Sequence, residues 1–75
     1  MEERILKILE ETNDELLTYT GDNMLEDGIV NSFTFIAMVS DLEDEFGIEI
    51  DEAFTDEEHF GNKDRIIATI KALME

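Results

Sequence analysis

An acidic loop turns into an amphipathic helix within residues 25–50, LEDGIVNSFTFIAMVSDLEDEFGIEI. The apolar residues after the loop recur at the three- and four-residue spacing of one helix face. They are Phe35, Met38, Val39, Leu42 and Phe46. Gly47 follows, where a glycine in the left-handed conformation commonly ends a helix. The pattern predicts a helix over residues 32–46, with Ser32 or Asn31 as its N-cap.

The flanking segments predict three more helices. Near-helical apolar spacing predicts a first helix over about residues 2–17, whose acidic first turn suits the positive end of the helix dipole. Its apolar positions are Ile5, Ile8, Leu9 and Leu16. Thr55 and Glu58 have capping-box spacing, which predicts a short third helix that ends near Phe60 and Gly61. Asn62 is expected to cap a last helix. Its inward residues would be Ile66, Ile67, Ile70, Leu73 and Met74.

The segments between the helices carry turn and connector signals. Residues 18–31 contain two glycines and several Asp and Asn residues, which predicts a long loop. Its apolar anchors would be Met24, Leu25, Ile29 and Val30. Residues 47–51 alternate like a strand, but a single short strand has no partner here, so we predict an extended connector that buries Ile48 and Ile50. The expected fold is an all-α, small four-helix bundle with three longer helices and one short helix.

Length and composition restrict the class of protein. A chain of 75 residues forms one small domain, residues 1–75, with a core just large enough to fold without crosslinks. The absence of cysteine excludes disulfides and thiolate metal sites. The acidic N-terminus lacks the apolar stretch of a signal peptide, and no apolar run approaches a membrane span. We therefore expect a soluble, cytoplasmic monomer without membrane insertion.

The net charge of −16 is unevenly distributed. All five basic residues lie near the two ends, whereas residues 8–62 hold 17 of the 21 acidic residues and no Lys or Arg. Such a surface repels nucleic acid and anionic lipid, and it attracts partners that carry basic patches. Solubility alone would be served by a surface of mixed charge. The pattern thus favours a protein that binds basic partner surfaces.

Ser32 is the first candidate for a functional residue, because it stands where the acidic loop becomes a helix. A hydroxyl at this position can cap the helix. The free N–H groups and the positive dipole end of the helix also favour a phosphate carried on that hydroxyl. The chain is thus suited to present a modified Ser32.

A family resemblance enters at this serine. The stretch DGIVNSF, residues 27–33, followed by a helix and the segment FGIEI, resembles the acyl and peptidyl carrier proteins that bear 4'-phosphopantetheine. The likeness extends to length, helix order and acidity, and its specificity rests on the residues around Ser32. The family motif is Asp-Ser-Leu, so Asn31 and Phe33 depart from it. Asn31 removes a negative charge beside the hydroxyl that takes the arm.

The resemblance implies an acyl-carrier-like bundle that is not itself an enzyme. A phosphopantetheinyl transferase would attach the 4'-phosphopantetheine of coenzyme A to Ser32. The arm would carry acyl intermediates of fatty acid or polyketide biosynthesis as thioesters. An acyl- or aminoacyl-activating ligase would load it, and an acyltransferase or synthase with a basic patch would unload it. An aminoacyl carrier of the D-alanyl or peptidyl type is the alternative, since residues 54–58 and 62–68 are somewhat similar to stand-alone D-alanyl carriers.

The resemblance also implies that partners meet the outward face of the helix that starts at Ser32. The candidate contacts are Phe33, Ile36, Ala37, Ser40, Asp41 and Asp44. Thr34 and Ala37 occupy places where carriers usually have acids, which suggests partners with an apolar patch near Ser32 and basic residues further along. Phe33 and Ile36 could instead belong to a widened core.

The sequence also bears on three other function classes. An EF-hand calcium loop is excluded because, with Gly28, Gly47 or Gly61 at its glycine position, ligand positions fall on apolar residues. An enzyme is the weakest alternative, since no catalytic constellation or phosphate loop is present and the lone His59 beside Phe60 is typical of a packing residue. An acidic protein-binding module that carries no arm remains open, and Ser32→Ala distinguishes it from a carrier.

Overall fold

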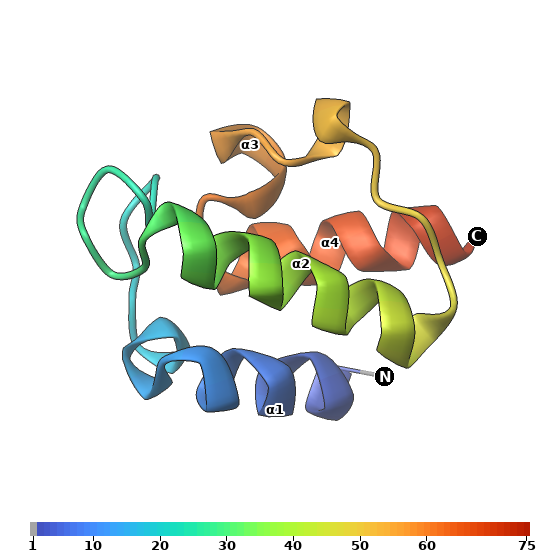
Figure 1. Ribbon diagram of the computed structural model, residues 1–75, viewed down its shortest axis with the longest axis horizontal. Coiled ribbons are helices and arrows are strands. Elements are labelled where there is room, and N and C mark those ends of the chain that lie inside the picture. Colours follow the sequence, from blue (N-terminus) through green and yellow to red (C-terminus); the bar gives the residue numbers. More distant parts are fainter. Residues whose placement is uncertain (1) are drawn as a thin grey trace.

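The computed structural model describes residues 2–75, with only the backbone at residue 57, and every secondary-structure element in that range is an α-helix or a 3₁₀ turn. The α-helices are α1 (Glu2–Thr12), α2 (Ser32–Phe46), α3 (Glu57–Phe60) and α4 (Lys63–Met74), and the 3₁₀ turns are η1 (Asp14–Leu17) and η2 (Glu52–Phe54). The predicted all-α fold with three longer helices and one short helix is confirmed (Figure 1). Within this range, the helices are too short or too polar for any of them to cross a lipid bilayer.

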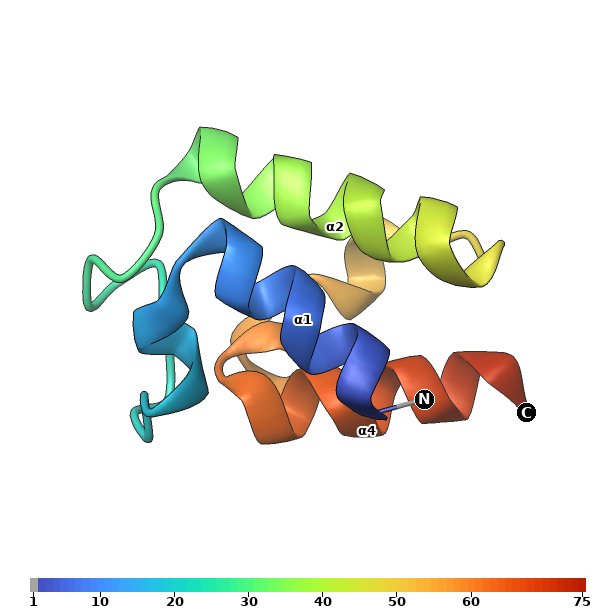
Figure 2. The same cartoon turned by 90° about the horizontal axis from the view of Figure 1, so that it is seen from below.

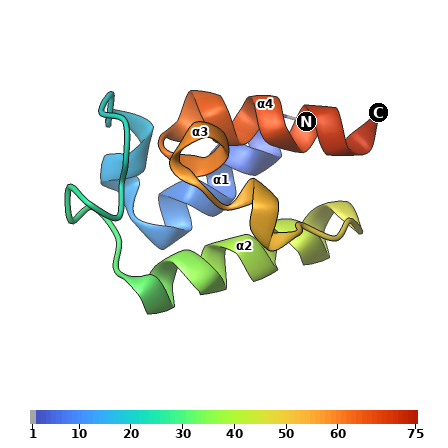
Figure 3. The same cartoon turned by 90° about the horizontal axis from the view of Figure 1, so that it is seen from above.

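The three long helices enclose the core between them. α1 contacts both α2 and α4 and covers one side of that pair, as the view from below shows (Figure 2). η2 and α3 cover the opposite side, where α3 packs on α4 (Figure 3). The long loop, residues 18–31, leads from η1 to the start of α2 at one end of the bundle (Figure 1). Ser32 therefore lies at this end of the molecule.

The predicted apolar stripes form the core, with two exceptions. The buried apolar side chains are Ile5, Leu9, Leu16, Met24, Val30, Phe35, Met38, Leu42, Ile50, Phe60, Ile66 and Ile70. The rings of Phe35 and Phe60 meet edge to face, with their centroids 5.8 Å apart. Leu25 and Met74 were predicted to point inward, but they are 38% and 46% exposed. Leu25 lies in a turn of the long loop, and Met74 is the last residue of α4.

The prediction of one continuous helix over residues 2–17 is wrong. α1 ends at Thr12, whose hydroxyl donates to the carbonyl of Ile8. Asn13 is extended, with φ −168°, and its Oδ1 accepts the Glu15 N–H at 3.0 Å, which starts the separate turn η1. Asn13 Nδ2 also donates to the carbonyl of Ile29 at 2.8 Å. The helix stops because this side chain bonds to the backbone in ways that a helical Asn13 would forgo.

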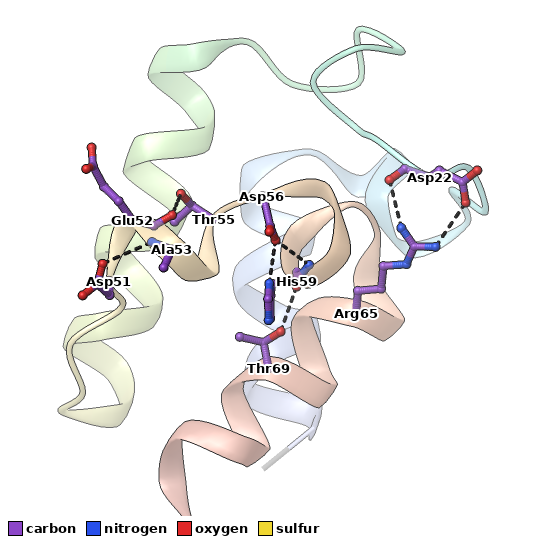
Figure 4. A network of polar contacts seen from close by, with 9 residues as sticks. All are labelled: Asp22, Asp51, Glu52, Ala53, Thr55, Asp56, His59, Arg65 and Thr69. Atoms are coloured by element: carbon purple, nitrogen blue, oxygen red, sulfur yellow. Dashed lines mark hydrogen bonds and ion pairs between the residues drawn. The ribbon is translucent and has the colours of Figure 1, made fainter.

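The predicted capping box of Thr55 and Glu58 is also wrong. The turn η2 comes first, and Thr55 closes it by donating from its hydroxyl to the Glu52 carbonyl at 2.8 Å (Figure 4). Asp56 takes the N-cap position of α3 instead, and its Oδ1 accepts the His59 N–H at 3.1 Å. The short helix therefore starts at residue 57 and ends at Phe60 as predicted.

The ends of α2 and the connector after it match the predictions. Gly47 is left-handed, with φ +63°, and its N–H bonds to the Glu43 carbonyl at the end of α2. Ile50 is buried and Ile48 half-buried against the core. The Ile50 N–H donates to Glu43 Oε2 at 2.8 Å, so the extended connector is fastened back onto α2.

Candidate functional site

Ser32 is the first residue of α2 and is exposed. Asn31 is the N-cap: its Oδ1 accepts the Thr34 N–H at 2.8 Å, and its carbonyl accepts the Phe35 N–H at 2.9 Å. Of the two candidate caps, the structure selects Asn31. Among the atoms that the structure describes, nothing forms a hydrogen bond with the Ser32 hydroxyl. The hydroxyl can therefore carry a substituent while the helix keeps its cap.

The electrostatic setting of Ser32 favours an anion. The first turn of α2 contains no acidic residue, unlike the first turns of α1 and α4. The partial positive charge of the helix start is therefore not neutralised within that turn. A phosphodiester on Ser32 Oγ would lie close to this charge and to the first N–H groups of the helix.

The long loop before Ser32 is bonded to the junction between α3 and α4. The Met24 N–H donates to the Gly61 carbonyl at 3.0 Å, between α3 and α4, and the Met24 side chain is fully buried. Asn62 Nδ2 donates to the Gly21 carbonyl at 2.8 Å. Arg65 contacts the carbonyl and the carboxylate of Asp22, each at 3.3 Å (Figure 4). These bonds fix the path by which the chain reaches α2.

Asn13 and Asn62 make the same pair of hydrogen bonds, and the sequence predicted only part of this role. Each Oδ1 caps a helical turn, and each Nδ2 donates to a carbonyl of the long loop. The cap at Asn62 was predicted, whereas the cap at Asn13 and both loop bonds were missed. The available signal was the choice of Asn over Asp, because only the amide offers an acceptor and a donor together. The two asparagines thus join the helix ends to the loop that presents Ser32.

A tyrosine closes the loop on itself. The Tyr19 hydroxyl donates to Asp27 Oδ2 and accepts the Asn23 N–H at 3.1 Å. Partial burial and the hydrogen bond to Asp27 raise the pKa of Tyr19 above its usual value of 10.0. The ring covers Gly21 so closely that a Cβ there would clash with it. This packing holds the middle of the loop compact.

All six predicted partner contacts are exposed on the outward face of α2. They are Phe33, Ile36, Ala37, Ser40, Asp41 and Asp44. Phe33 is 86% exposed and Ile36 63% exposed, so the alternative that they widen the core is wrong. Phe35 and Met38 point inward and are buried, as expected for core residues. A large apolar surface therefore lies beside Ser32 with nothing in the described chain to cover it.

His59 takes part in the structure of α3. Its Nδ1 lies 2.6 Å from Asp56 Oδ1, its ring meets Phe54 edge to face at 5.1 Å, and its carbonyl accepts the Thr69 hydroxyl (Figure 4). The hydrogen bond from His59 holds the pKa of Asp56 below its usual 3.8. His59 therefore stabilises the short helix α3 and bonds it to α4.

Two further observations bear on the site. Among the side chains that the structure describes, no group of three or more His, Asp or Glu is placed to hold a metal ion. Comparisons of the chain with family models, with curated proteins and with solved structures find no match. Ser32 thus combines a free hydroxyl at a capped helix start with exposed apolar neighbours, and it directly follows the fixed loop.

Proposed function

We propose that this chain is an acyl carrier protein that holds acyl groups as thioesters on a 4'-phosphopantetheine arm attached to Ser32. The observation that carries the proposal is the exposed Ser32 hydroxyl, which has no hydrogen-bond partner in the described part of the chain while Asn31 caps α2. A serine that served only as a cap would bond to the helix N–H groups with its own oxygen. Here the cap and the candidate attachment site are separate residues.

The chain's own residues fit such an arm. Ser32 Oγ would attack the phosphorus of coenzyme A that bears pantetheine, so that a new O–P bond forms as the P–O bond to adenosine bisphosphate breaks. The serine proton would pass to a base of the transferase, which remains a separate enzyme. The start of α2, with no acidic residue in its first turn, would stabilise the negative charge of the resulting phosphodiester. The bound arm supplies the thiol that the cysteine-free sequence lacks.

The proposed partners follow from the exposed face of α2 and from the charge. They are a phosphopantetheinyl transferase, an acyl- or aminoacyl-activating ligase, and a downstream acyltransferase or synthase with a basic patch. With a net charge of −16, association with such patches is accelerated at low salt. We place the protein in the cytoplasm as a monomer that binds no nucleic acid. An aminoacyl cargo, of the D-alanyl or peptidyl type, is the alternative to an acyl cargo.

The test is the intact mass of the protein after incubation with coenzyme A and a broad-specificity phosphopantetheinyl transferase. Ser32→Ala is compared with Ser40→Ala, because Ser40 is a second exposed serine on the same helix. We expect one phosphopantetheine on the unchanged protein and on Ser40→Ala, and none on Ser32→Ala. Circular dichroism confirms that each protein is folded, and an accepted carrier confirms that the transferase is active.

Two results would overturn the proposal. An arm that is still added to Ser32→Ala would place the attachment elsewhere. A folded protein that takes no arm under conditions where a known carrier is fully modified would instead favour the acidic protein-binding module. Such a module would use the exposed Phe33 and Ile36 directly.

A further inference from the structure

Two adjoining shallow depressions lie along the seam between α1 and α2 and are together named here the α1–α2 groove. Its first part, next to Ser32, is lined by Glu11, Thr12, Phe33, Thr34, Ala37 and Asp41. Its second part is lined by Ile8, Glu11, Asp41, Asp44 and Glu45. The two parts share Glu11 and Asp41, so they are adjacent. The end of α1 lies beside α2 at this place in the fold (Figure 2).

The chemistry of the groove changes along its length. At the Ser32 end it offers the Phe33 ring, 86% exposed, and the Ala37 methyl. The carboxylates of Glu11 and Asp41 lie where the two parts meet, and those of Asp44 and Glu45 line the second part. Among the lining residues there is no Lys or Arg. Of these carboxylates, only Glu45 is paired with a cation in the described chain, through Arg4.

The groove on the other side of α2 is different. It is lined by Phe35, Ile36, Val39, Ser40, Glu43, Ile50, Glu52 and Thr55. It has two carboxylates, and that of Glu43 already accepts the Ile50 N–H. The exposed acids of α2 that line these two grooves therefore lie on the α1 side of the helix, and Glu11 adds a residue of α1 to the same surface.

We propose that the α1–α2 groove is the docking site of the enzyme that adds the arm to Ser32. The occupant is a segment of that enzyme that places an apolar side chain against Phe33 and its Lys or Arg residues over Glu11, Asp41 and Asp44. Charge complementarity fixes the direction of the segment, since reversal would set its cations beside Phe33 and its apolar side chain among carboxylates. This inference rests on the proposed function and adds α1 to the contact surface.

The groove predicts that Glu11 matters and that its neighbour Glu10 does not. Both residues are exposed on α1, but Glu10 borders a different depression, beside Lys7 and Lys63. Glu11→Lys and Glu10→Lys change the net charge equally, which makes them a matched pair. The measurement is kcat/KM for phosphopantetheine addition at low and at high salt. At low salt we expect Glu11→Lys to lower kcat/KM by about five-fold to ten-fold, and Glu10→Lys by less than about two-fold. At high salt the two variants should converge.

A third variant tests the apolar end of the groove. Phe33→Ser should raise KM about equally at low and at high salt, because an apolar contact is not screened by ions. An effect of Phe33→Ser that disappeared in salt would contradict the proposed polarity. Thermal denaturation of each variant shows that the fold is kept, as expected for substitutions at exposed positions.

The outcomes separate this inference from the function on which it rests. If the unchanged protein takes no arm, the proposed function fails. If it takes the arm, but Glu11→Lys and Glu10→Lys lower kcat/KM equally at low salt, then only the overall charge matters and the groove is not the docking site. A five-fold or larger difference between the two variants, lost at high salt, supports the groove.

Discussion

Replacing Asn62 by Asp separates the two bonds that this side chain makes. Asp keeps the oxygen that accepts the Arg65 N–H at the start of α4. It loses the Nδ2 donor to the Gly21 carbonyl, and it sets a carboxylate against that carbonyl oxygen. Asn31→Asp is the matched control, because Asn31 also caps a long helix while its Nδ2 holds no partner in the described chain. The two substitutions add the same charge at equivalent helix positions.

The expected magnitudes follow from these bonds. A partly buried hydrogen bond contributes about 1 kcal/mol, and leaving its acceptor unsatisfied costs about 1–3 kcal/mol in total. Asn62→Asp should therefore lower the free energy of unfolding by about 1–2 kcal/mol, which corresponds to about 4–16 °C in Tm for a domain of this size. Asn31→Asp should change the free energy by about 0 to +0.5 kcal/mol, since a carboxylate at a helix start is favourable. Asn62→Ala loses the cap as well and should cost about 2–3 kcal/mol.

Urea denaturation followed by circular dichroism, at high salt to screen the added charge, measures these differences. The reasoning would be refuted if Asn62→Asp were as stable as Asn31→Asp. That result would mean that the bond from Asn62 to the loop contributes nothing to the fold. A large loss in Asn31→Asp would equally contradict it, because that side chain is used here only as a cap.

Three further predictions concern charge, acid and burial. The net charge of −16 should make Tm rise on addition of salt or magnesium, and a flat or falling Tm in differential scanning calorimetry would contradict this. Because His59 lowers the pKa of Asp56 in the folded state, the stability from this pair is present above the ordinary value of 3.8 and is lost as the pH falls through the lowered pKa. Asp56→Asn should thus be less stable than the unchanged protein at neutral pH, and the two should become equal in strong acid when urea midpoints are compared across pH. Phe35→Ala should cost about 3–5 kcal/mol in urea denaturation, whereas Phe33→Ala should stay within about 0.5 kcal/mol, since one ring is buried and the other exposed.

The parts of the fold that the sequence predicted are those with local signals. α2 has apolar positions at helical spacing, a cap at Asn31 and a left-handed Gly47, and its bounds matched the prediction. The start of α4 was likewise marked by Asn62. The break after Thr12 depends on a local bond from the Glu15 N–H to Asn13 and also on a bond from Asn13 to Ile29, which lies 16 residues away and leaves no local pattern. Thr55 was predicted to cap α3, but it closes the turn η2 instead and Asp56 caps the helix, which the local spacing did not indicate.

The sequence predicted the candidate site in part as well. The position of Ser32 at a helix start followed from sequence, but the choice of Asn31 as the cap came only from the geometry of the hydrogen bonds. The exposure of Phe33 and Ile36 required the packing of α2 against its neighbours. Glu11 could not be found from sequence, because its place beside Asp41 depends on how α1 crosses α2.

The fastening of the long loop has a consequence for the order of folding. Its bonds join the Asn13 side chain to residue 29, Asn62 to residue 21, and residue 24 to residue 61, so the loop is held by segments from both halves of the chain. The loop can acquire its native path only after α1 and α4 have come together. Proteases and hydrogen exchange at residues 20–30 should then report opening of the whole molecule, in contrast to most loops, which open locally. We therefore expect the segment before Ser32 to become protected from exchange only when the helices on both sides of it have packed.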